Sequence, residues 1–364
     1  MKQFKPYRKK FLSWLYTIPI TLSLVGLFFV FEASSVKSFQ QYGDSFHFFK
    51  LQAIWIIFGI AAMAFFSVFD YHNLYYLAFF FIFGTIVLLS IVLIPGVGYQ
   101  AGGARRWIDL GPFNLQPTEL AKLSVIVYLS SWFTNKERRR FFSFLILLSL
   151  LMLLIILQPD MGTAIIVFFL GITIYFLAGI ELWYLIFLIP VSIGVFLLLV
   201  KVSPYRFKRI LAFFDPKLDP LGITYHINQI LISLESGALL GLGLGASRQK
   251  YLYLPEAHTD SIFAIIGEEF GFIGGVLIIA VYIYLMYRIY QIVKHAPDRF
   301  GKLMAGGIFA FFNLQAIINL AGMVNLLPLT GVPLPFISYG GSNLLVSFIF
   351  IGILINISKK VRFL

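Results

Sequence analysis

The chain of 364 residues lacks cysteine altogether and is poor in charged residues. Without cysteine, disulfide bonds and thiolate metal sites are excluded, and the redox compartment stays undetermined. Charged residues make up only 12% of the chain while apolar residues make up 60%, which excludes an ordinary soluble domain of this length. The composition therefore predicts a polytopic membrane protein.

The formal net charge of +12 raises the question of a nucleic-acid partner. The basic residues are scattered between apolar runs, however, whereas a nucleic-acid surface needs them gathered in one patch. We predict no nucleic-acid partner and attribute the charge to membrane topology.

Apolar runs recur along the whole chain, and each is long enough, or nearly so, to cross a bilayer core of about 30 Å. They lie at approximately 11–31, 51–69, 75–95, 117–133, 142–158, 162–180, 183–201, 260–287, 303–326 and 342–357. Each run is expected to be helical because lipid offers backbone groups no hydrogen-bond partner. We predict an all-α integral membrane protein of about ten transmembrane helices, a single domain over 1–364, with a long extracytoplasmic loop at 202–259 between spans seven and eight.

Orientation follows from the lysine and arginine residues of the short loops, which accumulate on the cytoplasmic side. If the N-terminus is inside, the short outer loops hold only Lys37, Lys50, Arg105 and Arg106, and the short inner segments hold far more. The loop 202–259 is too long for the rule to weigh. Both termini are predicted to be cytoplasmic, and the first span is interpreted as a signal anchor because it is too long for a cleaved signal peptide.

With this topology, the polar motifs collect in the outer loops 96–116, 158–161, 202–259 and 327–341. Asp260 ends the third of these loops, at the mouth of a predicted span. A carboxylate is costly to keep in that position, so Asp260 is a functional-site candidate. An extracytoplasmic active site is implied.

The fourth span is expected to begin near Gln116, because Pro117 suits the first helical turn and Glu119 suits the positive end of the helix dipole. Lys122 then lies about 7 to 8 Å inside the helix and needs an anionic partner. Two interpretations stay open: Lys122 pairs with Glu119 or snorkels to the interface, or it belongs to a site.

Asp160 follows a long run without any charged side chain. It suits the N-cap of the span that starts near Gly162, and an N-cap can also face a polar cavity. Both interpretations are kept.

The start of the long loop, 203–216, mixes aromatic residues with Arg206, Lys208 and Arg209 in an amphipathic pattern. Such a segment is expected to lie in the membrane interface, and lipid anchoring is favoured over substrate contact. The glycine-rich stretch 237–245 lacks the context of a phosphate-binding loop and is interpreted as a flexible loop.

Small residues follow Asp260 at helical spacing, namely Ala264, Gly267, Gly271 and Gly275. Such a face usually means close helix packing. The competing hypothesis is a groove that holds a lipid tail below a headgroup at Asp260.

Glu268 and Glu269 add two acidic residues to the same predicted span. One of them is expected to pair with a lysine or arginine of a neighbouring helix. His258 is interpreted as a hydrogen-bonded loop residue, because the other histidines show no metal-site spacing.

Five long blocks, in one order and spread over nearly the whole chain, resemble the SEDS family. The blocks are GARRWIDLGPFNLQPTELAK, QPDMGTA, RFKRILAFFDPKLDPLGITYHINQ, GASRQKYLYLPEAHTDSIFAIIGEEFG and LLPLTGVPLPFISYGGSN. The version SRQKYLYLPEAHTD is more similar to the FtsW branch and its sporulation relative than to the RodA branch. Departures are Gly102 where Asn is usual, His226 where Gln is usual, and the order Asn-Leu-Ala-Gly from Asn319.

This resemblance implies a peptidoglycan glycosyltransferase that polymerises lipid II outside the cytoplasmic membrane, partnered by a class B penicillin-binding transpeptidase. It implies that Asp260 is catalytic, as a general base. The candidates for substrate binding are Arg105, Arg106, Glu119, Lys122, Asp160, Arg248, Glu256, His258 and Ser338.

Glycosyl transfer from a lipid pyrophosphate fits these residue types. A carboxylate can remove the proton of the attacking hydroxyl, and cations can meet the charge of the leaving group. The cationic candidates are Arg105, Arg106, Lys122 and Arg248, alone or with a divalent cation, Mg²⁺ or Mn²⁺. Its possible ligands would be Asp260, Asp160 and Glu119.

Two other classes of function stay open. A lipid II flippase also needs polar groups in a membrane cavity, but it is expected to hold them at the midplane in two related halves. A non-catalytic scaffold of the division machinery needs only the topology. The charges of this chain gather at the outer face and no internal repeat is visible, which favours an enzyme.

Overall fold

The computed structural model describes residues 4–101, 104–109, 111, 113–135, 140–179 and 183–361. Gly102 and Gly103, and the basic residues Lys136, Arg138 and Arg139 that support the predicted orientation, lie outside the described residues.

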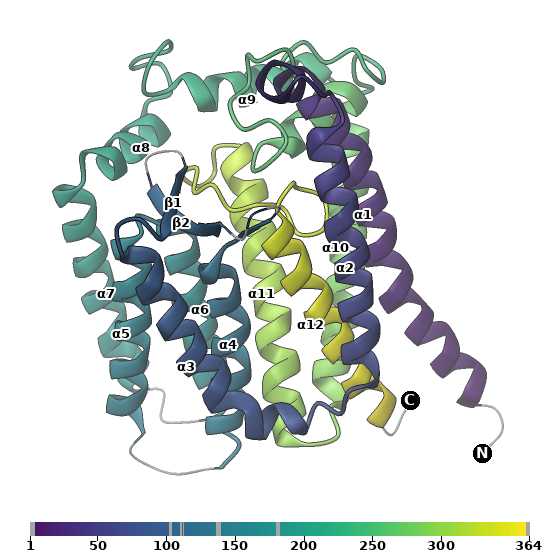
Figure 1. Ribbon diagram of the computed structural model, residues 1–364, viewed down its shortest axis with the longest axis vertical. Coiled ribbons are helices and arrows are strands. Elements are labelled where there is room, and N and C mark those ends of the chain that lie inside the picture. The colour runs from purple at the N-terminus through teal and green to yellow at the C-terminus, as the bar shows by residue number, and fades with distance from the viewer. Residues whose placement is uncertain are drawn as a thin grey trace.

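The described chain forms a bundle of long helices (Figure 1). The helices are α1 (Phe4–Tyr42), α2 (His47–Val68), α3 (Asn73–Leu93), α4 (Pro117–Trp132), α5 (Phe141–Leu157), α6 (Met161–Leu177), α7 (Trp183–Val202), α8 (Pro204–Phe214), α9 (Tyr225–Gly237), α10 (Ile262–His295), α11 (Arg299–Met323) and α12 (Gly341–Lys360). Each of the ten predicted spans coincides with one helix, and α8 and α9 lie inside the long loop 202–259.

Six helices in the described part of the chain are long and apolar enough to cross a membrane, namely α1, α2, α3, α10, α11 and α12. The pair formed by α7 and α8 would make a seventh, although the chain bends by 103° between them. Helices α4, α5 and α6 have 16 or 17 residues. At 1.5 Å per residue they are about 24 to 26 Å long, a little short of the bilayer core.

Burial separates the centre of the bundle from its periphery. The most apolar window of α12 is 89% buried, whereas that of α3 is 28% buried, so α12 runs through the middle and α3 faces outward. Helix α12 packs most closely on α2, where a Cβ at Gly352 would lie 2.6 Å from the carbonyl oxygen of Met63. A larger residue than glycine at this position would clash, so Gly352 allows the two helix backbones to pack in direct contact.

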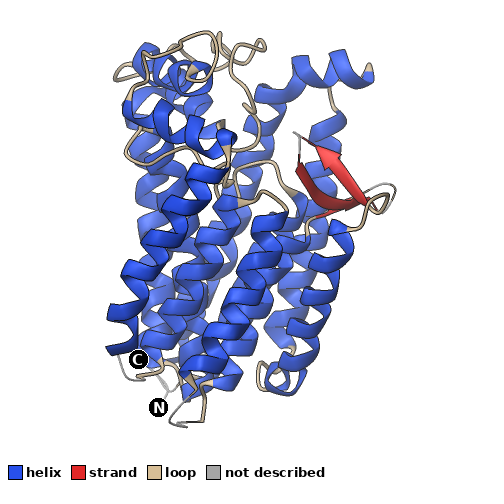
Figure 2. Ribbon diagram, turned by 90° about the vertical axis from the view of Figure 1, so that its left-hand side faces the viewer, coloured by secondary structure: helices blue, strands red, loops and turns tan. Residues whose placement is uncertain are grey.

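A small antiparallel sheet corrects the prediction of a purely helical fold. Its strands β1 (Gly98–Ala101), β2 (Ala104–Asp109) and β3 (Asn114–Leu115) run in the order β1-β2-β3 (Figure 2). The segment 96–116 was expected to be a loop. Instead, cross-strand pairs such as Tyr99 with Trp107 satisfy the hydrogen-bonding groups of its backbone.

The two ends of the bundle differ in architecture. The first turn of α1 and the last turn of α12 lie at one end, and α8, α9 and the sheet lie at the opposite end (Figures 1 and 2). The polar motifs of the outer loops therefore share one end of the molecule.

Candidate functional site

The segment 327–341, which joins α11 to α12, passes between the predicted site residues. A Cβ at Gly162, in the first turn of α6, would lie 2.8 Å from the carbonyl oxygen of Thr330. A Cβ at the next residue of the segment, Gly331, would lie 3.5 Å from the Asp260 Oδ2 atom. Gly331 has φ +73°, which favours glycine. The start of α6 and Asp260 are thus neighbours across this one segment.

Asp260 lies in the turn before α10, one residue before the N-cap Ser261, and is only 9% exposed. Its Oδ1 atom accepts a hydrogen bond of 3.1 Å from the hydroxyl of Thr259. Its backbone carbonyl accepts one of 2.8 Å from the side-chain amide of Asn319 on α11. The same amide donates to the carbonyl of Val332 at 2.8 Å. Asn319 therefore ties Asp260 to the segment 327–341.

Burial raises the pKa of Asp260 above its usual range. The charge of Glu256 raises it further, and His226 opposes the shift only in its protonated form. The Nε2 atom of His226, on α9, lies 2.8 Å from the Ser261 hydroxyl. Burial in turn lowers the pKa of His226, so this side chain is neutral at pH 7. A carboxylate with a raised pKa is a stronger base than an exposed one, which suits proton abstraction.

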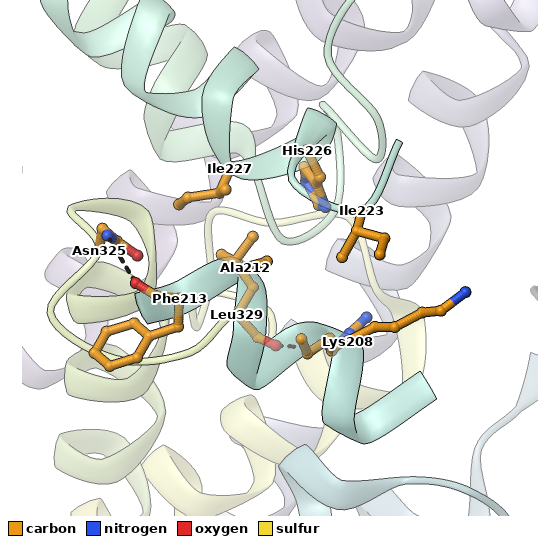
Figure 3. Close-up of a pocket in the computed structure, with 9 residues that line it drawn as sticks. Lys208, Ala212, Phe213, Ile223, His226, Ile227, Asn325 and Leu329 are labelled. Carbon is orange, nitrogen blue, oxygen red and sulfur yellow. Dashed lines mark hydrogen bonds between the residues drawn. The ribbon is translucent and has the colours of Figure 1, made fainter. Parts of the chain in front are cut away.

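A pocket of about 280 Å³ opens beside His226 (Figure 3). It is lined by Lys208, Arg209, Ala212, Phe213, Ile223, His226, Ile227, Asn325 and Leu329. The guanidinium of Arg209 donates a hydrogen bond of 2.8 Å to the carbonyl of Leu329, so α8 is attached to the segment after α11. Two cations among apolar side chains suit a ligand that is anionic at one end and apolar at the other.

Glu119 and Lys122 form the intrahelical pair that was one of the two predictions. Lys122 Nζ lies 2.7 Å from Glu119 Oε1, and the two side chains are 1% and 2% exposed. The other carboxylate oxygen of Glu119 accepts a bond of 2.9 Å from Asn343 on α12, and Lys122 Nζ lies 5.4 Å from the ring centroid of Phe311. This buried ion pair therefore connects α4 with α11 and α12.

Asp160 is the N-cap of α6, as predicted. Its Oδ1 atom accepts from the backbone N–H of Thr163 at 3.1 Å, and its Oδ2 atom accepts from the Thr163 hydroxyl at 2.9 Å. The side chains of Gln116 and Thr118 also donate to Oδ2, at 3.4 and 3.3 Å. The carboxylate therefore ties the start of α6 to the start of α4, and α4 begins at Pro117 with Gln116 as its N-cap, as expected.

The three predicted arginines differ in their surroundings. Arg106, on β2, donates through Nε to the carbonyl of Gln158 at 3.1 Å and through Nη2 to the carbonyl of Pro159. It holds the turn that precedes Asp160. The side chains of Arg105 and Arg248 are exposed, and within the described ranges no ion pair of theirs is found. These two are the arginines available to a ligand.

His258 and Ser338 serve the packing of the site. The ring of His258 is 3% exposed and lies between Phe48 and Tyr339, with centroids 4.7 and 5.5 Å away. Burial, above all, lowers the pKa of His258 to about 4, so the ring is neutral at pH 7. The hydroxyl of Ser338 accepts from the backbone N–H of Leu334 at 2.8 Å. His258 is a loop residue, as predicted, but the expected side-chain hydrogen bond is not found at its Nδ1 atom, which is buried without a partner among the described residues.

Glu256 stands at the rim, with its side chain 54% exposed and 3.6 Å from Lys37 on α1. It is closer to solvent than the other acidic candidates.

The candidate metal ligands do not converge. Glu119 is held by Lys122, Asp160 caps α6, and Asp260 accepts from Thr259. Within the described ranges, no group of three His, Asp or Glu side chains is placed to hold a metal ion. The described residues therefore form no ready-made three-ligand cation site.

The groove expected beneath Asp260 is filled by the protein itself. A Cβ at Gly267 would lie 2.5 Å from the side chain of Leu234 on α9, and one at Gly271 would lie 2.4 Å from the backbone nitrogen of Gly241. Close packing is therefore right and the lipid groove is wrong at this face. Helix α10 is also broken at Gly271, which has φ 64° and ψ −163°.

Glu269 has a basic partner, as expected, but from a different element. It pairs with Lys250 of the long loop at 3.2 Å and not with a neighbouring helix.

Sequence reasoning missed His226 and Asn319 as parts of the site, and it favoured a lipid role for Lys208 and Arg209. His226 and Asn319 were noticed only as departures from the family pattern. Their proximity to Asp260 depends on how α9 and α11 pack, for which the sequence carries no direct signal.

Comparison with known proteins agrees with this fold. The family model for FtsW, RodA and SpoVE, described as a cell cycle protein, matches residues 13–363. Stage V sporulation protein E of Bacillus subtilis is 39% identical over 96% of this chain and 97% of its own length. A probable peptidoglycan glycosyltransferase FtsW of Geobacter is 37% identical over 94% of this chain and 95% of its own length.

Solved structures share the architecture. A chain of a peptidoglycan synthase complex superposes with a TM-score of 0.77 at 24% identity, over 95% of this chain and 96% of that one. The rod shape determining protein RodA of Thermus thermophilus does so with 0.70 at 24% identity, over 96% and 97%. The helical membrane fold and the match over nearly the full length together place the chain: it belongs to the SEDS family of FtsW, RodA and SpoVE.

Proposed function

We propose that the chain is a peptidoglycan glycosyltransferase that polymerises lipid II at the outer face of the cytoplasmic membrane. The observation that carries this proposal is the full-length similarity to relatives named probable peptidoglycan glycosyltransferases, such as FtsW of Geobacter at 37% identity. The buried carboxylate of Asp260 can act as a base, and the pocket lined by His226 carries two cations, so these groups suit the chemistry of such a reaction.

In this proposal Asp260 is the general base. Its carboxylate takes the proton of the attacking sugar hydroxyl while a new bond forms between that oxygen and the anomeric carbon. The bond from the anomeric carbon to the phosphate oxygen breaks, and the lipid pyrophosphate leaves with its electron pair. The raised pKa of Asp260 favours the proton transfer, because a base is most effective when its pKa approaches the working pH.

The pocket between α8 and α9 is the proposed place of the pyrophosphate. Lys208 and Arg209 contribute positive charge there, and the apolar residues around them suit the beginning of a lipid chain. Arg105 and Arg248, both exposed, are proposed as further cations at the rim. No step in this mechanism runs through a metal ion.

We further propose that all ten bundle helices span the membrane, as one domain with both termini in the cytoplasm and the loop 202–259 outside. The short α4 is buried along nearly its whole length, so its partners are other helices and not lipid. That environment lets a helix of about 24 Å serve in a bilayer core of about 30 Å.

We propose a class B penicillin-binding transpeptidase as the partner, because one structurally similar chain comes from a peptidoglycan synthase complex. The similarity to stage V sporulation protein E and to FtsW proteins favours a role in division or sporulation over one in elongation.

The decisive experiment incubates the purified protein and its transpeptidase partner with lipid II and resolves the products on a gel. The wild type is expected to form glycan polymer, and Asp260→Ala is expected to form none. Asp44→Ala is the matched control, because Asp44 lies in an exposed ion pair with Lys50 at the turn between α1 and α2. Polymer formed by Asp260→Ala would exclude the proposed base. Absence of polymer from the folded wild type would favour a flippase or a scaffold.

A further inference from the structure

The residues 238–245, named here the leucine strap, complete the hydrogen bonding of a broken helix. The break at Gly271 leaves two carbonyls and two backbone N–H groups of α10 without their usual helical partners. The strap meets all four, through Leu242 N to Glu268 O (3.0 Å), Gly243 N to Glu269 O (3.1 Å), Phe272 N to Ala238 O (2.8 Å) and Ile273 N to Leu239 O (3.2 Å). The strap is therefore built into α10 and is not a flexible loop.

Glycines make this close approach possible. A Cβ at Gly241 would lie 2.1 Å from the carbonyl oxygen of Glu269, and one at Gly271 would lie 2.4 Å from the nitrogen of Gly241. Both glycines have positive φ, +83° and +64°. The backbone of the strap thus faces α10, and its leucine side chains are left on the outside.

The position of the break sets the level of the strap relative to the membrane. The part of α10 beyond Gly271 runs to His295, about 24 residues or roughly 36 Å, which is enough to cross the bilayer core by itself. The strap therefore lies where that span leaves the membrane. It follows α9, at the end of the bundle opposite to the first turn of α1 (Figure 1).

The leucine side chains of the strap are unusually exposed for apolar residues. The exposed fractions are 67% for Leu239, 79% for Leu240, 45% for Leu242 and 63% for Leu244. The α10 residues bonded to the strap, Phe272 and Ile273, are 65% and 57% exposed, like the lipid-facing residues of the other spans. The leucines are thus continuous with the lipid-facing surface of α10.

We propose that the leucine strap inserts its side chains into the outer leaflet, at the boundary between headgroups and acyl chains. Four backbone hydrogen bonds to α10 remove polar groups that lipid could not satisfy, and four leucines supply the apolar contact. The exposed cation of Arg248 follows the strap and is suited to the headgroup layer. This inference does not depend on the proposed enzymatic activity.

The chain lacks cysteine, so a single introduced thiol can be labelled without background. Leu240→Cys would carry an environment-sensitive fluorophore, and the protein would be reconstituted into phosphatidylcholine and phosphatidylglycerol vesicles with or without brominated acyl chains. Leu221→Cys is the control, because Leu221 is 91% exposed but belongs to the segment between α8 and α9. Thermal unfolding of both variants in detergent should match that of the wild type.

The expected result is a blue-shifted emission at position 240 and loss of its fluorescence in brominated vesicles, with neither effect at position 221. No quenching at position 240, or equal quenching at both positions, would overturn the proposal. Quenching that disappears when the transpeptidase partner is added would assign the strap to a protein interface, and would also overturn it.

Discussion

Replacing Lys250 by methionine tests a buried ion network at the outer end of the bundle. Lys250 Nζ lies 2.6 Å from Glu32 Oε2 on α1 and 3.2 Å from Glu269 Oε1 on α10, and its side chain is 7% exposed. Burial alone would lower the pKa of Lys250, but the bond to Glu32 and the charge of Glu269 together raise it. The ammonium group is therefore charged at every physiological pH, and the substitution by methionine removes one positive charge from the network.

The expected loss of unfolding free energy depends on the carboxylates that the substitution leaves without a basic partner. Glu269 is 0% exposed, and among the described residues its side chain accepts, apart from Lys250, only from the Ser247 N–H, at 3.4 Å. Breaking a buried pair by removing one partner typically costs about 3–5 kcal/mol, because the remaining charge is uncompensated. Glu32 is 19% exposed and can recover some hydration, which places the expected loss near the lower end, at about 3 kcal/mol.

A second lysine provides a matched control. Lys360 forms a bridge of the same length, 2.6 Å, with Asp70, but the two side chains are 38% and 46% exposed. An exposed pair contributes about 0–1 kcal/mol, so Lys360→Met should cost far less than Lys250→Met.

The assay is the free energy of unfolding, measured by reversible denaturant titration in mixed micelles. The double variant Lys250→Met, Glu269→Gln should recover most of the loss because it removes the orphaned charge. If Lys250→Met costs no more than Lys360→Met, or if the double variant recovers nothing, the reasoning about this network is refuted.

Three further predictions concern the site. Burial raises the pKa of Asp260 above 3.8, so ionisation of this carboxylate lowers the stability of the folded protein once the pH exceeds that value. Asp260→Asn should therefore abolish polymer formation yet raise the unfolding free energy at pH 7. The wild-type polymerisation rate should fall on acidification at a pH above 3.8, and rate and unfolding measurements against pH would check both results. Gly331→Ala places a methyl group 3.5 Å from the Asp260 carboxylate, at a backbone φ of +73°. It should lower the unfolding free energy by about 1–2 kcal/mol and remove most of the polymer yield. The control Gly43→Ala is also at positive φ but in open space, so it should lower the stability without lowering the polymer yield. His226→Gln keeps a hydrogen-bonding group for the Ser261 hydroxyl and should retain polymerisation, and His226→Leu should reduce it in the same gel assay; equal activity of the two variants would contradict a role for that bond.

Local rules were enough to predict several parts of the site. Pro117 and Glu119 marked the start of α4, Asp160 marked the start of α6, and the pairing of Glu119 with Lys122 followed from their spacing on one helix. Each of these features depends on residues within one helical turn, so neighbours in the sequence are sufficient to determine it.

Other features depended on contacts between distant segments. Asn319 reaches the backbone of Asp260 only because α11 packs beside α10, and Lys250 meets Glu32 across more than 200 positions of sequence. Helical periodicity did not predict the break at Gly271. The leucine strap, which satisfies the backbone groups left unpaired by this break, lies about 30 residues earlier in the sequence.

Hydropathy, helix caps and motifs are local properties, so they were sufficient to predict the membrane-protein class, the ten helical segments, the family and Asp260 as the leading candidate. The packing of distant segments was needed to show that the face beneath Asp260 is packed and not a lipid groove, that the three candidate metal ligands do not form one cluster, and that His226 lies near Asp260 and lines the pocket. The physical reason is that convergence of side chains is set by helix packing and by the path of the segment 327–341, which no local pattern encodes.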